Sequence, residues 1–355
     1  MRKIGLIISI VVILFIFCVP ASADERSNEY IEMFENTVGD KYKNLIGSDS
    51  LISEIGPDRV IFEFVGLLTG GASRTGGLFL LLLAGIMISG ATSSFVQDGF
   101  TSKATLILIC SSAISVMVPV IKEAARALSE LQSFFALFIP VSAALSVSSG
   151  AVSTAAAQAM GMNITVAILS KVIEPLFLAL SSFGLGISVI ASFGDDELSS
   201  FCSGVKSFFL WAMGLCCALI MGTMSLQTVV CSAADSAKMR AAKYAAGSLI
   251  PVVGSTVSGA LGTLVGGLSY AKGMIGAGGI AVAVSIFISP LITLLLYRCA
   301  LSVCVGISGY LGITPCSKIY GALRQGIDLF ISVYAIGAVL CVFEIALFMA
   351  GGVKG

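Results

Sequence analysis

Charged residues inside apolar stretches are the first candidates for chemistry in this chain. Lys171 and Glu174 are three residues apart within the apolar stretch 163–193, so they share one face of a helix. Glu344 lies within the apolar stretch 329–350 and has no basic residue near it in sequence. A charge inside hydrocarbon costs roughly 3 kcal/mol or more, so such residues pair, face water or mark a pathway. We therefore predict for all three either a structural role or a role in an ion or solute conduit.

The residue types on which most enzymes and metal sites depend are missing or unfavourably placed. The chain has no histidine, which removes the commonest general base and the commonest metal ligand. Its ten cysteines form no C-x-x-C pair, and most lie in apolar runs where they act as small hydrophobic residues. No G-x-x-x-x-G-K-[ST] phosphate loop is present. We predict a protein that is not an enzyme, with no catalytic residues, no cofactor and no metal.

The composition predicts the elements that must position these residues. Hydrophobic residues make up 57% of the chain and charged residues only 11%, whereas about a quarter of a soluble domain is charged. The 20 basic and 20 acidic residues balance, which gives no reason to expect nucleic acid as a partner. We predict an all-α polytopic membrane protein, a bundle of about seven or eight transmembrane helices in contact with membrane lipid. The predicted spans are 76–96, 104–121, 131–150, 163–193, 208–230, 279–297, 299–314 and 329–350.

The N-terminal part differs in character from the rest of the chain. Arg2 and Lys3 precede an apolar run that ends in A-S-A at 21–23, the pattern of a secretory signal peptide. An uncleaved first membrane helix is the alternative to cleavage before Asp24. Half of the 20 acidic residues follow within Asp24–Glu63, and both alternatives place them outside the cytoplasm. The predicted divisions are a signal peptide at 1–23, an acidic extracytoplasmic or interfacial segment at 24–70 and a polytopic transmembrane domain at 71–355.

Basic and acidic loops predict the orientation of the first spans. One loop is basic and contains Lys238, Arg240 and Lys243, and we predict that it lies in the cytoplasm. The acidic loop Asp195–Glu197 is then predicted to lie outside the cytoplasm. The topology after residue 245 remains open. The glycine-rich segment Ile250–Leu268 is predicted to be re-entrant or broken, and the alternative is an ordinary span packed through its G-x-x-x-G motif.

One segment has an unusual sequence for the start of a membrane element. It includes Gln227 in S-L-Q, Arg240 and Lys243 in R-A-A-K-Y, and Pro251 and Gly254 in I-P-V-V-G. A second motif, I-P-V-S-A-A-L-S-V-S-S-G-A-V-S, occurs earlier in the chain, in the predicted span 131–150 and just after it. With these motifs the chain resembles the stage III sporulation protein AE family of endospore-forming bacteria. The resemblance extends over about residues 75–350 and is strongest in Met224–Gly279.

The resemblance implies a role rather than a reaction. It implies a membrane component of the secretion-like channel complex between mother cell and forespore, required for endospore development after engulfment. The implied location is the mother-cell membrane around the forespore, where the protein spans the membrane several times. The implied partners are other membrane proteins of the stage III sporulation operon and, indirectly, a forespore channel protein. From the residues alone, the alternative is a stand-alone transporter or ATPase-driven permease subunit that moves a small solute or ion.

Overall fold

The structure is a computed structural model that describes a large part of the chain. The described residues are Glu32, Phe34, 75–77, 79–91, 99–173, 175, 196–249 and 254–351. Within them the backbone is helical apart from short turns and contains no strand, so the all-α prediction is confirmed for this part of the chain. The predicted signal peptide and nearly all of the predicted acidic segment lie outside the described residues, as do Glu174 and Pro251.

The helices are long compared with the thickness of a membrane. The main elements are α5 (Gly99–Ser148), α6 (Val152–Ile168), its π-helical continuation η2 (Leu169–Ile173), α8 (Asp196–Leu249), α9 (Gly254–Tyr310) and α10 (Thr314–Ala350). A shorter apolar helix covers Thr75–Ala91. The 50 residues of α5, 54 of α8 and 57 of α9 correspond to about 75–85 Å each. Because the hydrocarbon core of a bilayer is about 30 Å thick, these helices extend well beyond one membrane thickness.

The predicted division into spans is wrong at two places. Residues 104–121 and most of 131–150 belong to one continuous helix, α5. Residues 279–297 and most of 299–314 likewise belong to α9. Charged residues between the two stretches of each pair lower the local hydropathy, but lysine, arginine and glutamate are good helix formers and do not interrupt a helix. The described residues contain five helices that are long and apolar enough to cross a membrane.

The predicted re-entrant element is also absent from the described part of its segment, Ile250–Leu268. Gly254 begins α9, and the helix continues without a break to Tyr310. The alternative, an ordinary span packed through Gly262 and Gly266, agrees with this continuous helix, but its packing is not seen among the described residues, because a Cβ at Gly266 would have nothing within 4 Å. Helical hydrogen bonds satisfy the backbone here despite the glycines.

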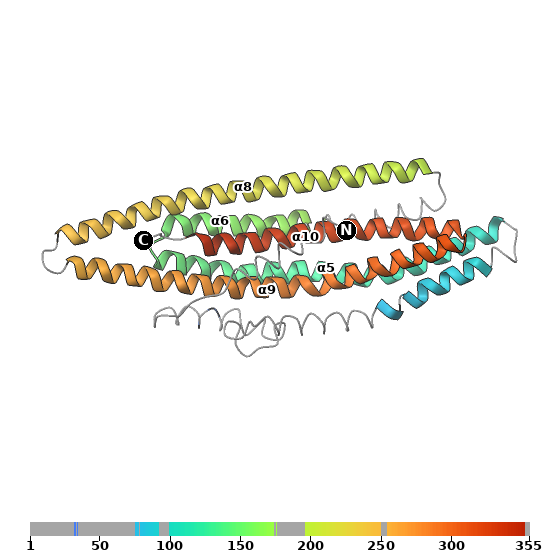
Figure 1. Ribbon diagram of the computed structural model, residues 1–355, viewed down its shortest axis with the longest axis horizontal. Helices are drawn as coiled ribbons and strands as arrows, with labels where there is room; N and C mark the ends of the chain where they lie inside the picture. Colours follow the sequence, from blue (N-terminus) through green and yellow to red (C-terminus); the bar gives the residue numbers. More distant parts are fainter. Residues whose placement is uncertain are drawn as a thin grey trace.

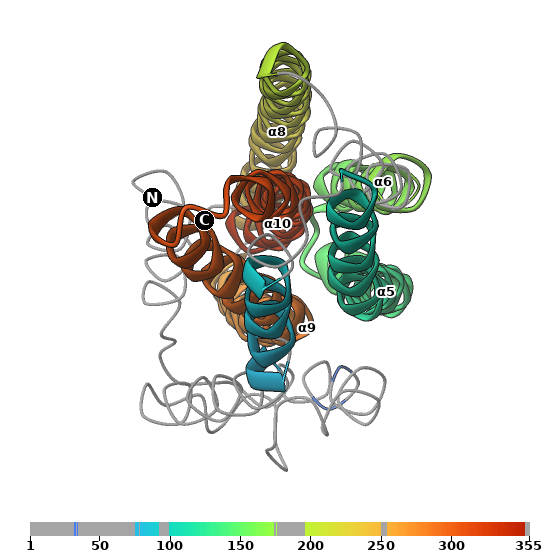
Figure 2. The same ribbon diagram turned by 90° about the vertical axis from the view of Figure 1, so that its right-hand side faces the viewer.

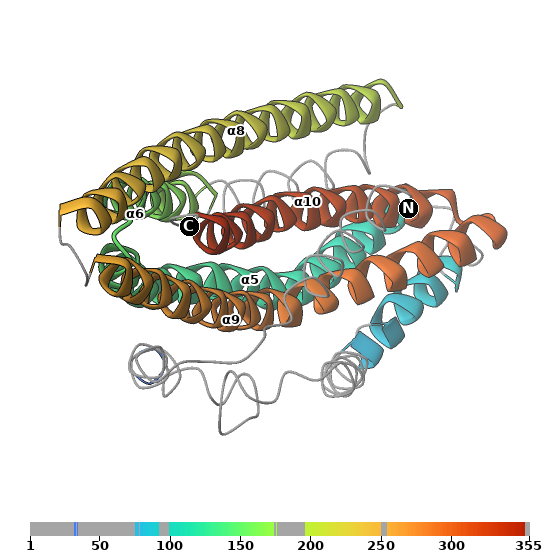
Figure 3. The same ribbon diagram turned by 60° about the vertical axis from the view of Figure 1, so that its left-hand side comes forward.

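α10 lies at the centre of the bundle. The end view in Figure 2 shows α5 and α6 on one side of α10, α9 on the other, and α8 along an outer edge. Figures 1 and 3 show that α5, α8 and α10 run in one direction while α6 and α9 run back. Gly150 and Gly312 occupy the tight turns after α5 and α9 with φ of 79° and 71°, a conformation that favours glycine. The α5–α6 turn and the end of α10 therefore lie at one end, and the end of α8 and the start of α9 extend beyond them; this end is called here the basic end.

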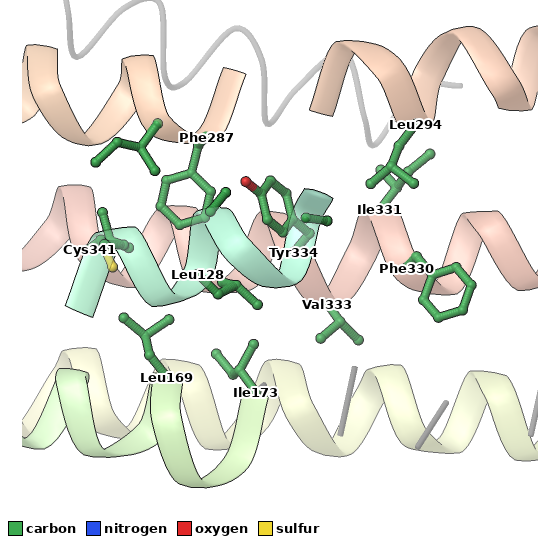
Figure 4. Packing of buried hydrophobic residues seen from close by; sticks show 14 of the residues in the cluster. Leu128, Leu169, Ile173, Phe287, Leu294, Phe330, Ile331, Val333, Tyr334 and Cys341 are labelled. Carbon is green, nitrogen blue, oxygen red and sulfur yellow. The ribbon is translucent and has the colours of Figure 1, made fainter. Parts of the chain in front are cut away.

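The core of the bundle forms where α5, η2, α9 and α10 meet. Figure 4 shows Leu128 of α5, Leu169 and Ile173 of η2, Phe287 of α9 and Tyr334 of α10 pointing toward one another. The Phe287 and Tyr334 rings are in edge contact, with centroids 5.0 Å apart. In a lipid environment, close packing of this kind rather than transfer out of water holds helices together.

Gly279 on α9 lies in close contact with α5. A Cβ at Gly279 would lie 2.7 Å from Cε2 of Phe138, whereas a Cβ at Gly273, on the same helix, would have nothing within 4 Å. We expect Gly279→Ala to displace Phe138 and to destabilise the fold by about 1–3 kcal/mol. Gly273→Ala should be neutral or stabilise by up to about 1 kcal/mol through helix propensity. Thermal unfolding in detergent measures both, and equal midpoints for the two variants would contradict the close packing.

Candidate functional site

Asp235 on α8 is a fully buried acid that holds the start of α6. Its Oδ2 accepts hydrogen bonds from the Thr154 backbone N–H at 2.7 Å and from the Thr154 hydroxyl at 2.9 Å, and its Oδ1 accepts one from the Ser153 N–H at 3.3 Å. The first N–H groups of a helix lack intrahelical acceptors, and the helix dipole favours a negative charge there. Asp235 therefore acts as an N-terminal cap that is supplied by a different helix.

Lys272 on α9 plays the complementary role at the end of α10. It is 3% exposed, and its ammonium donates to the Gly351 carbonyl and to Oε1 of Gln158 at 3.5 Å. The ammonium also lies 4.8 Å from the centroid of the Phe348 ring. The last carbonyls of a helix lack donors, and its dipole favours a positive charge at that end. Lys272 thus caps α10 from a neighbouring helix.

Gln158 on α6 connects four helices at this level. Its Nε2 donates to the Leu347 carbonyl of α10 at 2.9 Å. Its Oε1 accepts from Lys272 of α9 and, at 3.5 Å, from the Ser146 hydroxyl of α5. An amide offers two donors and an acceptor with two lone pairs, and Gln158 uses both kinds to link α5, α6, α9 and α10.

Glu344 lies deeper in the bundle and is only 2% exposed. Its carboxyl faces Gly161 of α6 and Met224 of α8, since a Cβ at Gly161 would lie 3.0 Å from Oε2 of Glu344 and 3.1 Å from the sulfur of Met224. The fully buried Thr165 hydroxyl lies beside the carboxyl. Among the described residues, neither Oε1 of Glu344 nor Oγ1 of Thr165 has a hydrogen-bond partner. The bundle thus contains a buried acid with spare hydrogen-bonding capacity.

The other residues singled out from the sequence lie elsewhere. Lys171 is exposed on η2, and because Glu174 lies outside the described residues, their pairing stays a prediction. Arg240 on α8 is exposed, and Gln227 and Lys243 on the same helix are half-buried. Gly254 is the first residue of α9, and Pro251 lies outside the described residues. Of the predicted site residues, Glu344 alone is seen at the polar interior of the described bundle.

Sequence reasoning missed three members of this polar interior: Asp235, Gln158 and Lys272. A signal for Lys272 does exist, because it is the single charged residue between Lys243 and Arg298. Gln158 and Asp235 have no comparable signal, because their partners are far away in sequence. In the part of the chain that the structure describes, no group of three or more Cys, Asp or Glu residues could hold a metal ion.

Comparison with known proteins identifies the family. The family description "Stage III sporulation protein AE" matches residues 72–352. The chain belongs to the stage III sporulation protein AE family. The stage III sporulation protein AE of Bacillus subtilis (strain 168) is 22% identical over 230 residues, which cover 62% of this chain and 56% of that relative. The match thus spans little more than half of the relative's length, and no solved structure matches the chain.

The predicted family is therefore confirmed, and its extent agrees closely with the predicted 75–350. All four polar residues of the interior, Gln158, Asp235, Lys272 and Glu344, fall within the matched region. The polar interior is thus part of the family region of the chain.

Proposed function

We propose that this protein is a membrane component of the secretion-like channel complex between mother cell and forespore, required for endospore development after engulfment. The family match over residues 72–352 carries the proposal. The five helices of the described residues that are long and apolar enough to cross a membrane fit a multi-pass protein of the mother-cell membrane around the forespore. The partners proposed are other membrane proteins of the stage III sporulation operon and, indirectly, a forespore channel protein.

Charged residues at one level of the bundle suggest where a membrane would lie. α5 contributes Lys122, Glu123 and Arg126, and Arg298 of α9 is paired with Asp328 of α10. Between this charged belt and the ends of α5 and α10 nearest the basic end, α5, α6 with η2 and α10 each contribute about 20–25 mostly apolar residues, as does α9 between Lys272 and Arg298, enough to cross the hydrocarbon core. We propose that the bilayer surrounds this section, with the predicted transmembrane domain 71–355 extending beyond it on the far side of the belt.

The charges along α8 support one orientation in the membrane. α8 begins next to the acidic loop Asp195–Glu197 and ends with Lys238, Arg240 and Lys243. From Ser236 to Ile327 the sequence contains no acidic residue. Cytoplasmic loops are enriched in lysine and arginine, so the basic end is placed in the cytoplasm together with the end of α10.

Impermeant cysteine reagents test this orientation. In a variant whose native cysteines are replaced, we expect Tyr310→Cys to be labelled from outside intact cells, because Tyr310 is 93% exposed at the end of α9 away from the basic end. Arg240→Cys should be labelled only after the cells are permeabilised. The reverse pattern would invert the topology.

The part of the bundle beyond the belt suits contact with partner subunits. Large apolar side chains are exposed there: Leu80, Met87, Ile107, Val303 and Tyr310. Exposed apolar patches outside a bilayer are typical of protein–protein contacts, which favours a subunit of a larger complex. The alternative, a stand-alone transporter or ATPase-driven permease subunit for a small solute or ion, is favoured by the polar groups buried around Glu344 and Lys272.

Deletion of the gene tests the proposal. We expect unchanged vegetative growth and an arrest of sporulation after engulfment, restored by the full-length chain. Affinity purification from sporulating cells should then recover the other membrane proteins of the operon. A deletion strain that forms normal heat-resistant spores would contradict the proposal. Solute transport by the purified chain alone in vesicles would favour the alternative, a stand-alone transporter.

A further inference from the structure

We propose that Glu344 is a proton-binding site, whose carboxyl takes up and releases a proton inside the bundle with the Thr165 hydroxyl as its hydrogen-bond partner. The ligand is the proton itself. The proposal concerns the chemistry of the purified chain and does not depend on the proposed role in the channel complex.

The two unpartnered atoms complement each other chemically. A neutral carboxyl has an O–H donor, so protonated Oε1 of Glu344 can donate to Oγ1 of Thr165, and both atoms gain a partner. When the proton leaves, the Thr165 hydroxyl can rotate and donate to the carboxylate oxygen. A threonine hydroxyl therefore serves both states of the acid, which a fixed donor such as a backbone N–H cannot do.

The surroundings favour reversible binding over a permanent ion pair. Lys272 on α9 provides the ammonium on the side of Phe348, one helical turn from Glu344 along α10. No ion pair joins Lys272 to Glu344 among the described residues, because the ammonium is used by Gly351 and Gln158. No direct contact with an ammonium therefore holds the carboxylate ionised.

The other elements packed against Glu344 contribute few ionisable groups. α10 itself contributes the buried thiol of Cys341. α6 and α8 present uncharged groups, namely Gly161, Thr165 and Met224. On α5, the acids Glu123 and Glu130 lie near Tyr334, ten residues and about 15 Å away along α10. These acids belong to the level of the charged belt.

Gln158 lies on the same face of α6 as Thr165, nearer to the basic end. Gly161 and Thr165 follow Gln158 by three and seven residues, so all three share a face of α6. Gln158 contacts Lys272, whose ammonium reaches the Gly351 carbonyl at the end of α10. The absence of a side chain at Gly161 leaves room for the Glu344 carboxyl on this face of α6.

Infrared spectroscopy of the purified full-length protein tests the proposal. We expect the carbonyl stretch of a neutral carboxylic acid that shifts in heavy water and disappears reversibly as the pH is raised. Glu344→Gln should abolish this band, while Glu130→Gln, at an exposed acid on α5, should leave it intact. Glu344→Asp keeps a carboxyl and should retain a band at a shifted position.

Three results would overturn the proposal: no such band at any pH at which the protein is folded, a band that survives in Glu344→Gln, or a band that does not respond to pH. Thr165→Val removes the hydroxyl with little change of shape and should shift both the band position and the midpoint of its pH titration. Thr165→Ser keeps the hydroxyl and should behave like the unchanged protein. If Thr165→Val leaves both quantities unchanged, Thr165 is not the partner.

Discussion

Replacement of Asp235 by alanine is expected to destabilise the bundle by about 3 kcal/mol or more. The substitution leaves the Thr154 and Ser153 N–H groups at the start of α6 without an acceptor, and each buried unsatisfied group costs about 1–3 kcal/mol. It also removes the negative charge that the helix dipole favours at this end. Thermal unfolding in detergent and the amount of protein in the membrane measure the loss.

Two matched variants distinguish the capping role of Asp235 from its ion pair with Lys238. Asp235→Asn keeps one acceptor oxygen and should lose only about 1–2 kcal/mol. Lys238→Ala removes the basic partner of Asp235, but the lysine side chain is 68% exposed, so its loss should cost less than about 1 kcal/mol. If Asp235→Ala were as stable as Lys238→Ala, Asp235 would not act as a cap.

Replacement of Lys272 by methionine is expected to have the second-largest effect. Methionine keeps most of the length of the side chain but leaves the Gly351 carbonyl without its buried donor and Oε1 of Gln158 with only the Ser146 hydroxyl, which should cost about 2–3 kcal/mol in total. The last turn of α10 should then open more often, and hydrogen exchange of its amides should be faster.

Lys272→Arg and Arg240→Met serve as controls for this result. The first keeps the positive charge and should retain most of the protection of the last turn of α10. The second removes an exposed basic residue at the same end of the bundle and should have almost no effect. Unchanged hydrogen exchange at the end of α10 in Lys272→Met would contradict the assigned cap.

The signs of these two charges follow one rule. Asp235 is an acid at the N-terminus of α6, and Lys272 is a base at the C-terminus of α10, so each complements the helix end that it touches. This explains how single charges are accommodated in an apolar bundle without a buried ion pair between them.

The all-helical fold, the family and the interior position of Glu344 could be predicted from the sequence, because composition, motifs and an isolated acid are local signals. The joining of predicted spans into α5 and α9 could not. Hydropathy treats Lys122 and Arg298 as breaks, whereas helix continuity depends on backbone hydrogen bonds that basic residues leave intact. The glycines of Ile250–Leu268 misled for a similar reason, since their unfavourable helix propensity, up to about 1 kcal/mol each relative to alanine, does not interrupt the helical hydrogen bonds that run from Gly254 to Tyr310.

The caps could not be predicted because they depend on three-dimensional proximity. Asp235 reaches a helix start 82 residues before it, and Lys272 reaches a helix end 79 residues after it. No local pattern encodes such a pairing. The isolation of Lys272 in a long uncharged stretch shows that it needs a partner, but not which helix end supplies one.

The central position of α10 has a consequence for biosynthesis. A ribosome delivers the other helices of the bundle first, so α5, α6, α8 and α9 enter the membrane before the helix that they surround has been made. Until then Gln158 lacks the Leu347 carbonyl, and Lys272 lacks the Gly351 carbonyl. Before α10 is made, the nascent bundle therefore has a gap at its centre, lined by polar side chains that lack part of their hydrogen bonds. Only the insertion of α10 fills this gap.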